Sequence, residues 1–359
     1  MSSKSHRFLS LTATLMAVVG GISFICLHHV NGDVAAPPPQ GMVLIRGGQF
    51  LMGSNQTMSQ LNERPRHWVR VRGFWMDATH VTNDQFSRFV LATRYVTTAE
   101  KKPDWETIRV QLPAGTSKPD DAMLVPGAMV FQGTAKPVAL DDASQWWAYV
   151  PGANWRHPQG PGSSIVGKGD HPVVQVSYED AAAYARWIKK RLPTEAEWEF
   201  AARGGLDQAK YSWGDQLQIN GKMQANIWDA KSRPFPVVDP ATGDPAGTSP
   251  VGSFPRNGYG LFDMSGNAWQ WVSDWYRFDY FQIQARTSGE SVIVDPRGPA
   301  DSFDPADAGV PVNAPKRVIR GGSFLCNEEY CQSYRLSARR GSDPYSPMSH
   351  LGFRLVKDL

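Results

Sequence analysis

The sequence predicts an α+β fold that is rich in loops and has little regular secondary structure. Three observations support this prediction. The 359 residues include 33 glycines and 27 prolines, which favour turns over long regular elements. The 13 tryptophans supply large apolar surfaces that can pack a core between short elements. Short runs with strand periodicity also alternate with short helical patterns that begin at recognisable capping residues.

Composition and charge exclude several classes of protein. With 41% hydrophobic and 20% charged residues, the chain is typical of a globular protein that can bury a core. The formal net charge is only +3 and no long basic or acidic run is present, so nothing indicates binding to nucleic acid. No second break in composition follows Met42, which predicts one domain over residues 42–359.

The N-terminal residues 1–32 are predicted to direct export. Lys4 and Arg7 precede an apolar stretch over residues 8–27, as in a signal peptide or an uncleaved signal-anchor. A Pro-rich linker over residues 33–41 leads to the body of the protein. Both the cleaved signal and the membrane anchor remain open. Either would place the body outside the cytoplasm, whether periplasmic, secreted or anchored facing outward.

The body begins with a run of short predicted strands. Periodicity favours strands over Met42–Ile45 and Gln49–Met52, separated by a glycine turn, and over His67–Trp75. A further strand is predicted over Pro172–Val176. Residues 206–320 contain mostly turn residues, aromatics and short strand patterns, so no long element is expected there.

Capping boxes predict where three helices begin. In each, a Ser or Thr is followed three residues later by Gln, Asp or Glu, which satisfies two free backbone N–H groups. The boxes start at Thr82, Ser177 and Thr194, and the third helix is expected to end at Gly204-Gly205.

Only two cysteines, Cys326 and Cys331, lie outside the N-terminal segment, where Cys26 is interpreted as a buried apolar residue. Their spacing would place the two thiols on opposite faces of a strand, or about 140° apart on a helix. Cooperation therefore requires an irregular chain, which residues 327–329 could provide. A structural disulfide, two separate buried thiols and a redox or soft-metal site remain open. Two thiolates suit Cu(I), whereas zinc prefers four ligands.

The surroundings of the pair favour the third interpretation. Several segments of the chain match the sequence pattern of one known protein family. They are Arg317–Cys326, Tyr330-Cys331, Tyr334-Arg335, Leu351–Arg354, Gly152–Pro158, Arg191–Glu199, Ala225–Trp228, Asn257–Leu261 and Gly266–Trp269. Together they make the chain, from about Met42 to its end, resemble formylglycine-generating enzymes (sulfatase-modifying factors), whose fold is a relative of the C-type lectin fold. Several segments mark the wider superfamily, which includes non-oxidases. The C-x4-C pair after Gly-Gly-Ser marks the oxidases.

The resemblance implies an oxidase that converts the cysteine of a C-x-P-x-R segment, in a newly made sulfatase, to Cα-formylglycine with O2. In that family the cysteines matching Cys326 and Cys331 hold Cu(I), and the residues matching Ser323 and Trp269 lie in the same pocket. Both also have a structural interpretation. Ser323 follows two glycines in a turn, and Trp269 can serve core packing.

The family also binds structural Ca²⁺. The residues that match one calcium site are Asn226, Ile227 (through its carbonyl) and Asp244. The residues that match a second are Asp263, Gly266, Ala268 and Gln270. Gln270 of the second site, and His80 before Val-Thr-Asn, each stand where a Glu is usual in the family. The loss of carboxylates weakens a site for a hard cation, while Asp263 replaces an Asn and restores one charge. His350 replaces a frequent Asn near the active end.

Two other functions remain open. One is a non-catalytic, lectin-like binding module of the same fold, tethered to the membrane, in which the cysteines form a plain disulfide. The other is a sulfoxide synthase of the same superfamily, although such enzymes carry an added iron-binding helical domain that is not expected before Met42. The sequence predicts neither the oligomeric state nor the identity of the sulfatase.

Overall fold

The computed structural model describes residues 38–238 and 247–359. The predicted export segment and most of the linker lie outside these residues. Residues 38–359 form one compact unit. In the part of the chain that the structure describes, no helix is both long and apolar enough to cross a membrane.

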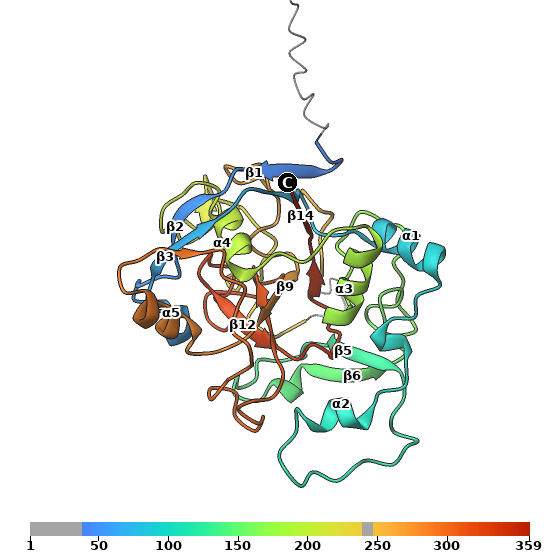
Figure 1. Ribbon diagram of the computed structural model, residues 1–359. Coiled ribbons are helices and arrows are strands. Elements are labelled where there is room, and N and C mark those ends of the chain that lie inside the picture. Colours follow the sequence, from blue (N-terminus) through green and yellow to red (C-terminus); the bar gives the residue numbers. More distant parts are fainter. Residues whose placement is uncertain (1–37, 239–246) are drawn as a thin grey trace, which may run out of the picture. The chain divides into compact units, whose positions relative to one another are not determined.

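The helices and strands are short, and the strands belong to several small sheets (Figure 1). The three larger sheets have the strand orders β1-β4-β14, β10-β3-β2 and β12-β11-β9-β13. Their strands are β1 (Met42–Ile45), β2 (Gly48–Met52), β3 (His67–Val71), β4 (Phe74–Asp77), β9 (Trp269–Trp275), β10 (Ile293–Val294), β11 (Arg317–Arg320), β12 (Arg339–Ser342), β13 (Leu351–Phe353) and β14 (Val356–Asp358). Two hairpins pair β5 (Gly127–Phe131) with β6 (Trp147–Pro151), and β7 (Gln218–Ile219) with β8 (Lys222–Met223).

The described α-helices are α1 (Asn83–Thr93), α2 (Trp105–Arg109), α3 (Tyr178–Trp187), α4 (Glu195–Arg203) and α5 (Tyr280–Ser288). Short 3-10 turns occupy Leu61–Glu63, Thr98–Glu100 and Ala143–Gln145. The longest helix described has 11 residues and the longest strand has 7. The predicted loop-rich α+β fold is therefore confirmed.

All three predicted capping boxes are present, at the start of α1, α3 and α4. At α1, the Thr82 hydroxyl accepts a hydrogen bond from Gln85 N, and the Gln85 side chain accepts one from Thr82 N at 2.9 Å. Helix α4 ends as predicted at Gly204, whose left-handed backbone, with φ of 58°, suits glycine. These three helix starts follow from local chemistry alone.

Strand prediction was partly wrong. β1 pairs with β4 and β2 with β3, so no hairpin joins β1 to β2. The run His67–Trp75 splits into β3 and β4 because the chain leaves one sheet and enters another there. Residues Pro172–Val176 form no strand. They make a single bridge to Thr82, and the left-handed backbone of Gln175, with φ of 59°, ends the extended run. Helix α5 was not predicted.

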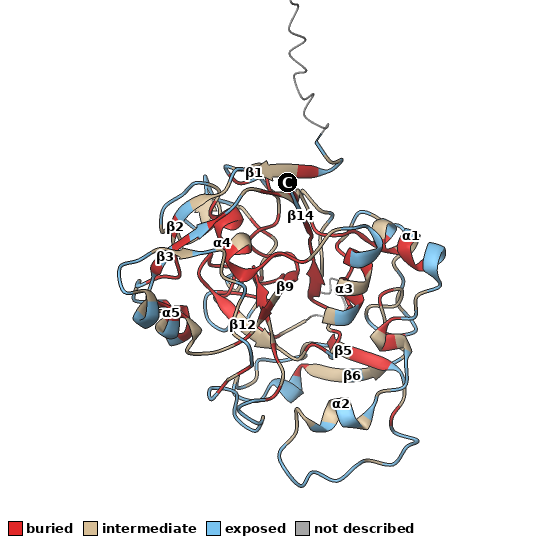
Figure 2. Ribbon diagram, viewed as in Figure 1, coloured by how far each residue is buried: buried red, intermediate tan, exposed pale blue. Residues whose placement is uncertain are grey.

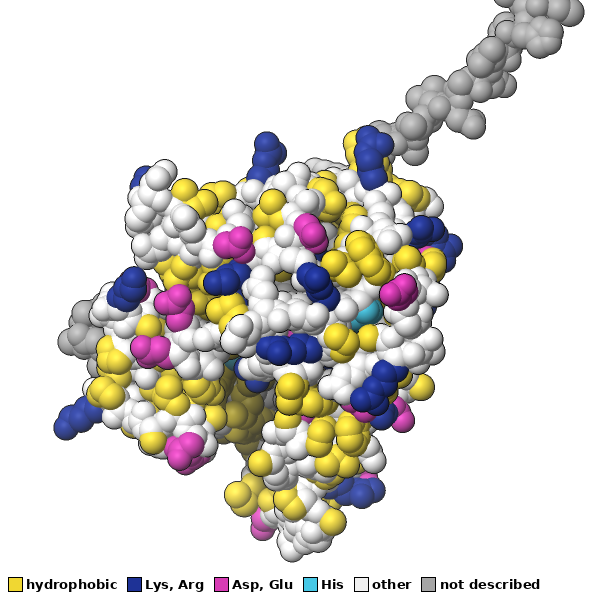
Figure 3. All heavy atoms as spheres, turned by 90° about the vertical axis from the view of Figure 1, so that its left-hand side faces the viewer, with side chains coloured by type: hydrophobic (Ala, Val, Ile, Leu, Met, Phe, Trp, Pro, Cys, Tyr) yellow, Lys and Arg dark blue, Asp and Glu magenta, His cyan; other side chains and the backbone are white. Residues whose placement is uncertain are grey.

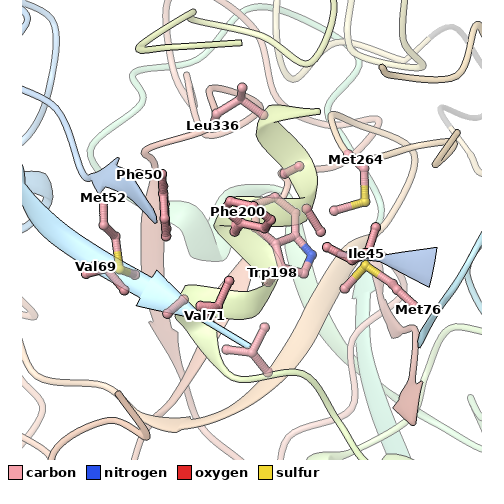
Figure 4. Close-up of a cluster of buried hydrophobic side chains, with 14 of the residues drawn as sticks. Ile45, Phe50, Met52, Val69, Val71, Met76, Trp198, Phe200, Met264 and Leu336 are labelled. Carbon is pink, nitrogen blue, oxygen red and sulfur yellow. The ribbon is translucent and has the colours of Figure 1, made fainter. Parts of the chain in front are cut away.

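Helix α4 packs its apolar face into the main core. Trp198 and Phe200 of this helix belong to one buried cluster with Val69 and Val71 of β3 (Figure 4). Figure 2 shows that burial is concentrated on the central strands and on α4, in which every residue but Glu197 is buried. By contrast, no residue of α2 is buried, and the loop that follows it is largely exposed. On the face that carries β2, β3 and α5, charges of both signs are interspersed (Figure 3).

A buried ionic network lies between α4 and the central sheet. Arg320 of β11 donates to the carboxylates of Glu195 and Glu199 at 2.7 Å each, and Arg339 of β12 donates to Glu195. These side chains are at most 1% exposed. Because buried charges require partners, the network ties α4 to the end of β11 where the candidate site begins.

Candidate active site

The sheet β12-β11-β9-β13 brings four chain segments together at one of its ends. β11 ends where β9 begins, because Arg320 pairs with Gln270. β12 begins there, because Arg339 also pairs with Arg320. β13 begins there as well, because Leu351 pairs with Trp269. One end of the sheet therefore brings together the predicted site residues Trp269 and Ser323. His350, which replaces a frequent Asn of the family, lies at the same end.

A glycine turn carries Ser323 away from the end of β11. Gly322 has a φ of 68°, and a Cβ atom there would lie 2.7 Å from Tyr334 N, so only glycine fits. Ser323 is fully buried, its hydroxyl accepts from Leu325 N at 3.3 Å, and its carbonyl accepts from Cys326 N at 2.9 Å. The serine thus shapes the turn that presents Cys326, in addition to lining the cavity described below.

The two cysteines form a disulfide, and their Cα atoms lie 4.6 Å apart. The chain between them is irregular, as their spacing required. Asn327 Oδ1 accepts hydrogen bonds from both Glu329 N and Tyr330 N at 2.7 Å. Cys326 is buried in an apolar cluster that also contains Trp269 and Ile319, whereas Cys331 is half-buried. The structure therefore brings the two sulfurs to one place.

An aromatic cluster supports the cysteine-bearing turn. Tyr330, next to Cys331, stacks on Phe235 with ring centroids 4.7 Å apart and contacts the edge of Trp146 at 5.7 Å. Phe235 and Trp146 in turn pack with Phe131 and other buried apolar residues. These contacts come from distant parts of the chain and fix the position of the turn.

A cavity of about 700 Å³ opens onto the disulfide. Its lining includes all four residues predicted as catalytic, namely Trp269, Ser323, Cys326 and Cys331. Sequence reasoning did not identify Trp147, Met129 and Lys316, which also line it, because no local pattern links them to the cysteines. The cavity is large enough for several residues of an extended peptide.

The charged groups of the cavity are paired with each other or with hydroxyl groups. Lys316 is buried and donates to Asp304 at 2.7 Å and to Asp307 at 2.5 Å. Burial raises the pKa of Asp343, although the Ser346 hydroxyl donates to it at 2.6 Å. Burial also lowers the pKa of His350 to about 3, so this imidazole is neutral at physiological pH.

The predicted calcium residues differ in how well they fit an ion. Asn226 and Ile227 line a separate cavity of about 560 Å³. No hydrogen bond from the described residues reaches the Asn226 side-chain oxygen or the Ile227 carbonyl, so both oxygens are available to a hard cation. Asp244, the predicted carboxylate of this site, lies outside the described residues.

The residues of the predicted second calcium site do not fit an ion. The Gln270 oxygen accepts from Trp198 Nε1 at 2.8 Å and from Arg354 Nε at 2.7 Å. The Ala268 carbonyl accepts from His80 Nε2 at 2.9 Å. A guanidinium and an imidazole N–H therefore occupy positions where a cation would require free oxygens. The Asp263 carbonyl accepts from Gln270 Nε2 at 3.0 Å, and burial raises the pKa of the Asp263 carboxyl. Gly266 lies instead against Asn226, because a Cβ atom there would meet the Asn226 carbonyl at 2.5 Å.

Within residues 38–238 and 247–359, no group of three or more His, Cys, Asp or Glu side chains is arranged to hold a metal ion.

Comparison with known proteins identifies similar chains. A family model described as "Sulfatase-modifying factor enzyme 1-like domain" matches residues 29–359. A formylglycine-generating enzyme of Mycobacterium tuberculosis is 44% identical over 317 residues, which cover 88% of this chain and 97% of that protein. One of Thermomonospora curvata is 42% identical over 332 residues, covering 91% and 97%.

Two other similar proteins are less identical in sequence to this chain. A mouse protein named as an inactive Cα-formylglycine-generating enzyme 2 is 35% identical over 321 residues, covering 87% of this chain and 84% of that protein. The solved structure of PvdO from Pseudomonas aeruginosa has a TM-score of 0.54 at 22% identity, covering 89% and 94% of the two chains. The structural likeness supports the fold alone.

Proposed function

This chain belongs to the formylglycine-generating enzyme family, and we propose that it oxidises the cysteine of a C-x-P-x-R segment in sulfatases to Cα-formylglycine with O2. The chain is thus an oxidase, and it matches its active relatives over nearly their whole length. The observation that carries the proposal is the joint lining of one cavity by Trp269, Ser323 and the cysteine pair.

Copper fits the cysteine pair. Two sulfurs on one short turn suit Cu(I), which is soft and accepts few ligands. Cys326 and Cys331 would hold it once their disulfide is reduced to two thiols. When bound, Cu(I) supplies the one-electron chemistry with O2 that side chains lack.

The protein's own residues bind and orient the substrate. The apolar walls, formed by Trp269, Ile319 and Met348 among others, exclude water around the reacting thiol. Ser323 keeps the turn in place through its hydrogen bond to Leu325 N. The cavity therefore positions one cysteine of the sulfatase beside Cys326 and Cys331. Conversion of its CH2–SH group to an aldehyde removes two electrons and releases the sulfur as H2S. O2 is the oxidant, and a thiol reductant supplies the other two electrons that reduce it to water.

Calcium at the first site stabilises the fold. The free oxygens of Asn226 and Ile227, together with Asp244, would supply hard ligands to the ion. A single structural Ca²⁺ is proposed, because Gln270 and Ala268 are already bonded to N–H donors at the second site.

Export is also proposed, with the body outside the cytoplasm. The Cys326–Cys331 disulfide is of a kind that persists in oxidising compartments, in agreement with the charged and apolar start of the sequence. Fractionation of cells that express the full chain tests this location. Recovery of the unprocessed protein in the cytoplasm would contradict it.

Aldehyde formation in a C-x-P-x-R peptide tests the activity, with O2, Cu(I) and a thiol reductant supplied. Cys326→Ser and Cys331→Ser each replace a soft ligand with a hard, protonated one and should abolish turnover. The double variant should be no less active than either, because residues that act as one unit are not additive. Cys26→Ser, which changes the third cysteine of the chain, is the matched control and should retain full activity.

The second candidate is the lectin-like binding module, which the disulfide observed in the structure would suit. It predicts no aldehyde from wild-type protein and no tight uptake of Cu(I) after reduction. A Cys331→Ser variant that forms aldehyde at the wild-type rate would disprove the proposed role of the pair.

A further inference from the structure

His350 occupies a defined place in the active cavity. It immediately precedes β13, and its carbonyl accepts a hydrogen bond from Trp269 N at 2.8 Å, which fixes its backbone beside the start of β9. Its side chain lines the same cavity as Ser323 and the cysteine pair. The histidine is thus part of the wall that faces a bound substrate.

The imidazole has no polar partner. Its ring meets the edge of Trp147, with centroids 4.7 Å apart and planes at 87°. Neither ring nitrogen makes a hydrogen bond to any described residue; Nδ1 is completely buried, whereas Nε2 is not. A buried polar atom without a partner is unfavourable, because it has lost its hydrogen bond to water. The other polar groups of this wall, such as Asp343 and Ser323, are satisfied.

The protonation state of His350 limits its chemistry. Burial keeps it neutral, so it is not a charged partner for an acidic group. A neutral imidazole offers one N–H donor and one acceptor. An extended peptide presents the complementary set, since its backbone carries alternating N–H and C=O groups.

We infer that His350 is a substrate-binding residue, whose imidazole forms a hydrogen bond with the backbone of the peptide that contains the cysteine to be oxidised. The inference rests on the proposed function. It adds a positioning role that the cysteine pair cannot fill, since the thiols contact the reacting side chain and not the peptide backbone. Trp147 holds the ring in place, and the arriving peptide forms its hydrogen bond with Nε2, the ring nitrogen that is not fully buried.

Equilibrium binding and steady-state kinetics test this role with a C-x-P-x-R peptide. For binding, a version of the peptide with serine in place of the reacting cysteine avoids turnover. His350→Phe keeps a ring against Trp147 and removes both nitrogens. The loss of one hydrogen bond should raise Kd and KM about 3- to 10-fold, while kcat changes less than about 2-fold. His350→Asn restores a donor and an acceptor and should recover most of the affinity.

His67→Phe is the matched control. His67 is another buried histidine whose ring meets the edge of an aromatic side chain, Phe281, at 5.0 Å, and its Nδ1 donates to the Pro65 carbonyl at 3.0 Å. It does not line the active cavity. The control should leave Kd and KM unchanged, which separates loss of substrate contact from general damage to a buried ring.

Each outcome is informative. The melting temperature of His350→Phe should equal or exceed that of the wild type, because the unpaired nitrogen is gone. If His350→Phe does not fold, His350→Leu takes its place. Unchanged Kd and KM in the apolar variant would overturn the inference. Wild-type protein that neither binds nor oxidises the peptide would instead refute the proposed function.

Discussion

Replacing Glu195 with glutamine should destabilise the protein strongly. One oxygen of Glu195 accepts from both Arg320 and Arg339 at 2.7 Å, and the other accepts from Arg339 at 2.7 Å. Glu195→Gln preserves the shape but removes the charge, and it places an amide N–H₂ opposite an N–H donor. Removal of one partner from a buried ion pair costs about 3–5 kcal/mol, because the remaining charge stays buried.

The loss should depend on pH through Asp274. Burial and the nearby Glu195 raise the pKa of Asp274 to about 7. In Glu195→Gln that repulsion is absent, so Asp274 ionises at lower pH and replaces part of the missing negative charge. The loss of stability should therefore be close to the full ~3–5 kcal/mol at about pH 5.5 and smaller at about pH 8.

Urea unfolding at the two pH values measures this effect. The matched control is Glu106→Gln, which breaks an ion pair with Arg109 on the surface, where the side chains are 66% and 55% exposed. It should change the free energy of unfolding by no more than about 0.5 kcal/mol. A loss below about 1.5 kcal/mol for Glu195→Gln at pH 5.5, or a loss equal to the control, would refute the proposed importance of the network.

Three further predictions concern stability. Between the ordinary pKa of 3.8 and about 7, folded Asp274 holds a proton that the unfolded chain has lost. The stabilisation that this proton provides is therefore full at low pH and disappears as the pH rises through about 7. In Asp274→Asn, the free energy of unfolding measured with urea should therefore vary less between about pH 5 and pH 8 than in the wild type. Gly322→Ala should lower the melting temperature far more than Gly309→Ala, because a Cβ at Gly322 would meet Tyr334 N at 2.7 Å whereas the surroundings of Gly309 are open. Chelation of Ca²⁺ should lower the melting temperature of the wild type, and Asn226→Ala should remove that response; an unchanged wild-type melting curve would argue against the site.

The helix starts could be predicted because their determinants are local. Each capping box needs only a hydroxyl and a side chain three residues later. Sheet partners could not be predicted in the same way. The start of β9 pairs with both β11 and β13, and β10 pairs with β3 from a distant part of the chain. No short pattern records those pairings, so the periodicity of the sequence predicts β3 and β4 as one strand.

The candidate site was predictable to the extent that its residues cluster in sequence. Ser323, Cys326 and Cys331 lie on one segment, and their resemblance to a known family identified them together. Trp147 comes from a separate hairpin and reaches the cavity only through the packing of β5 and β6 near the end of the central sheet. Its contact with the His350 ring could be recognised only in three dimensions.

The second calcium site shows why residue types alone cannot assign a metal site. Gln270 has a side-chain oxygen that can bind Ca²⁺ or accept hydrogen bonds, and its position in the sequence does not distinguish the two. In the structure that oxygen accepts from both Trp198 and Arg354. The carboxylate usual in the family at this position would add the negative charge that a cation needs, whereas the amide of Gln270 adds none. With His80 also donating to Ala268, the N–H groups satisfy these oxygens without an ion.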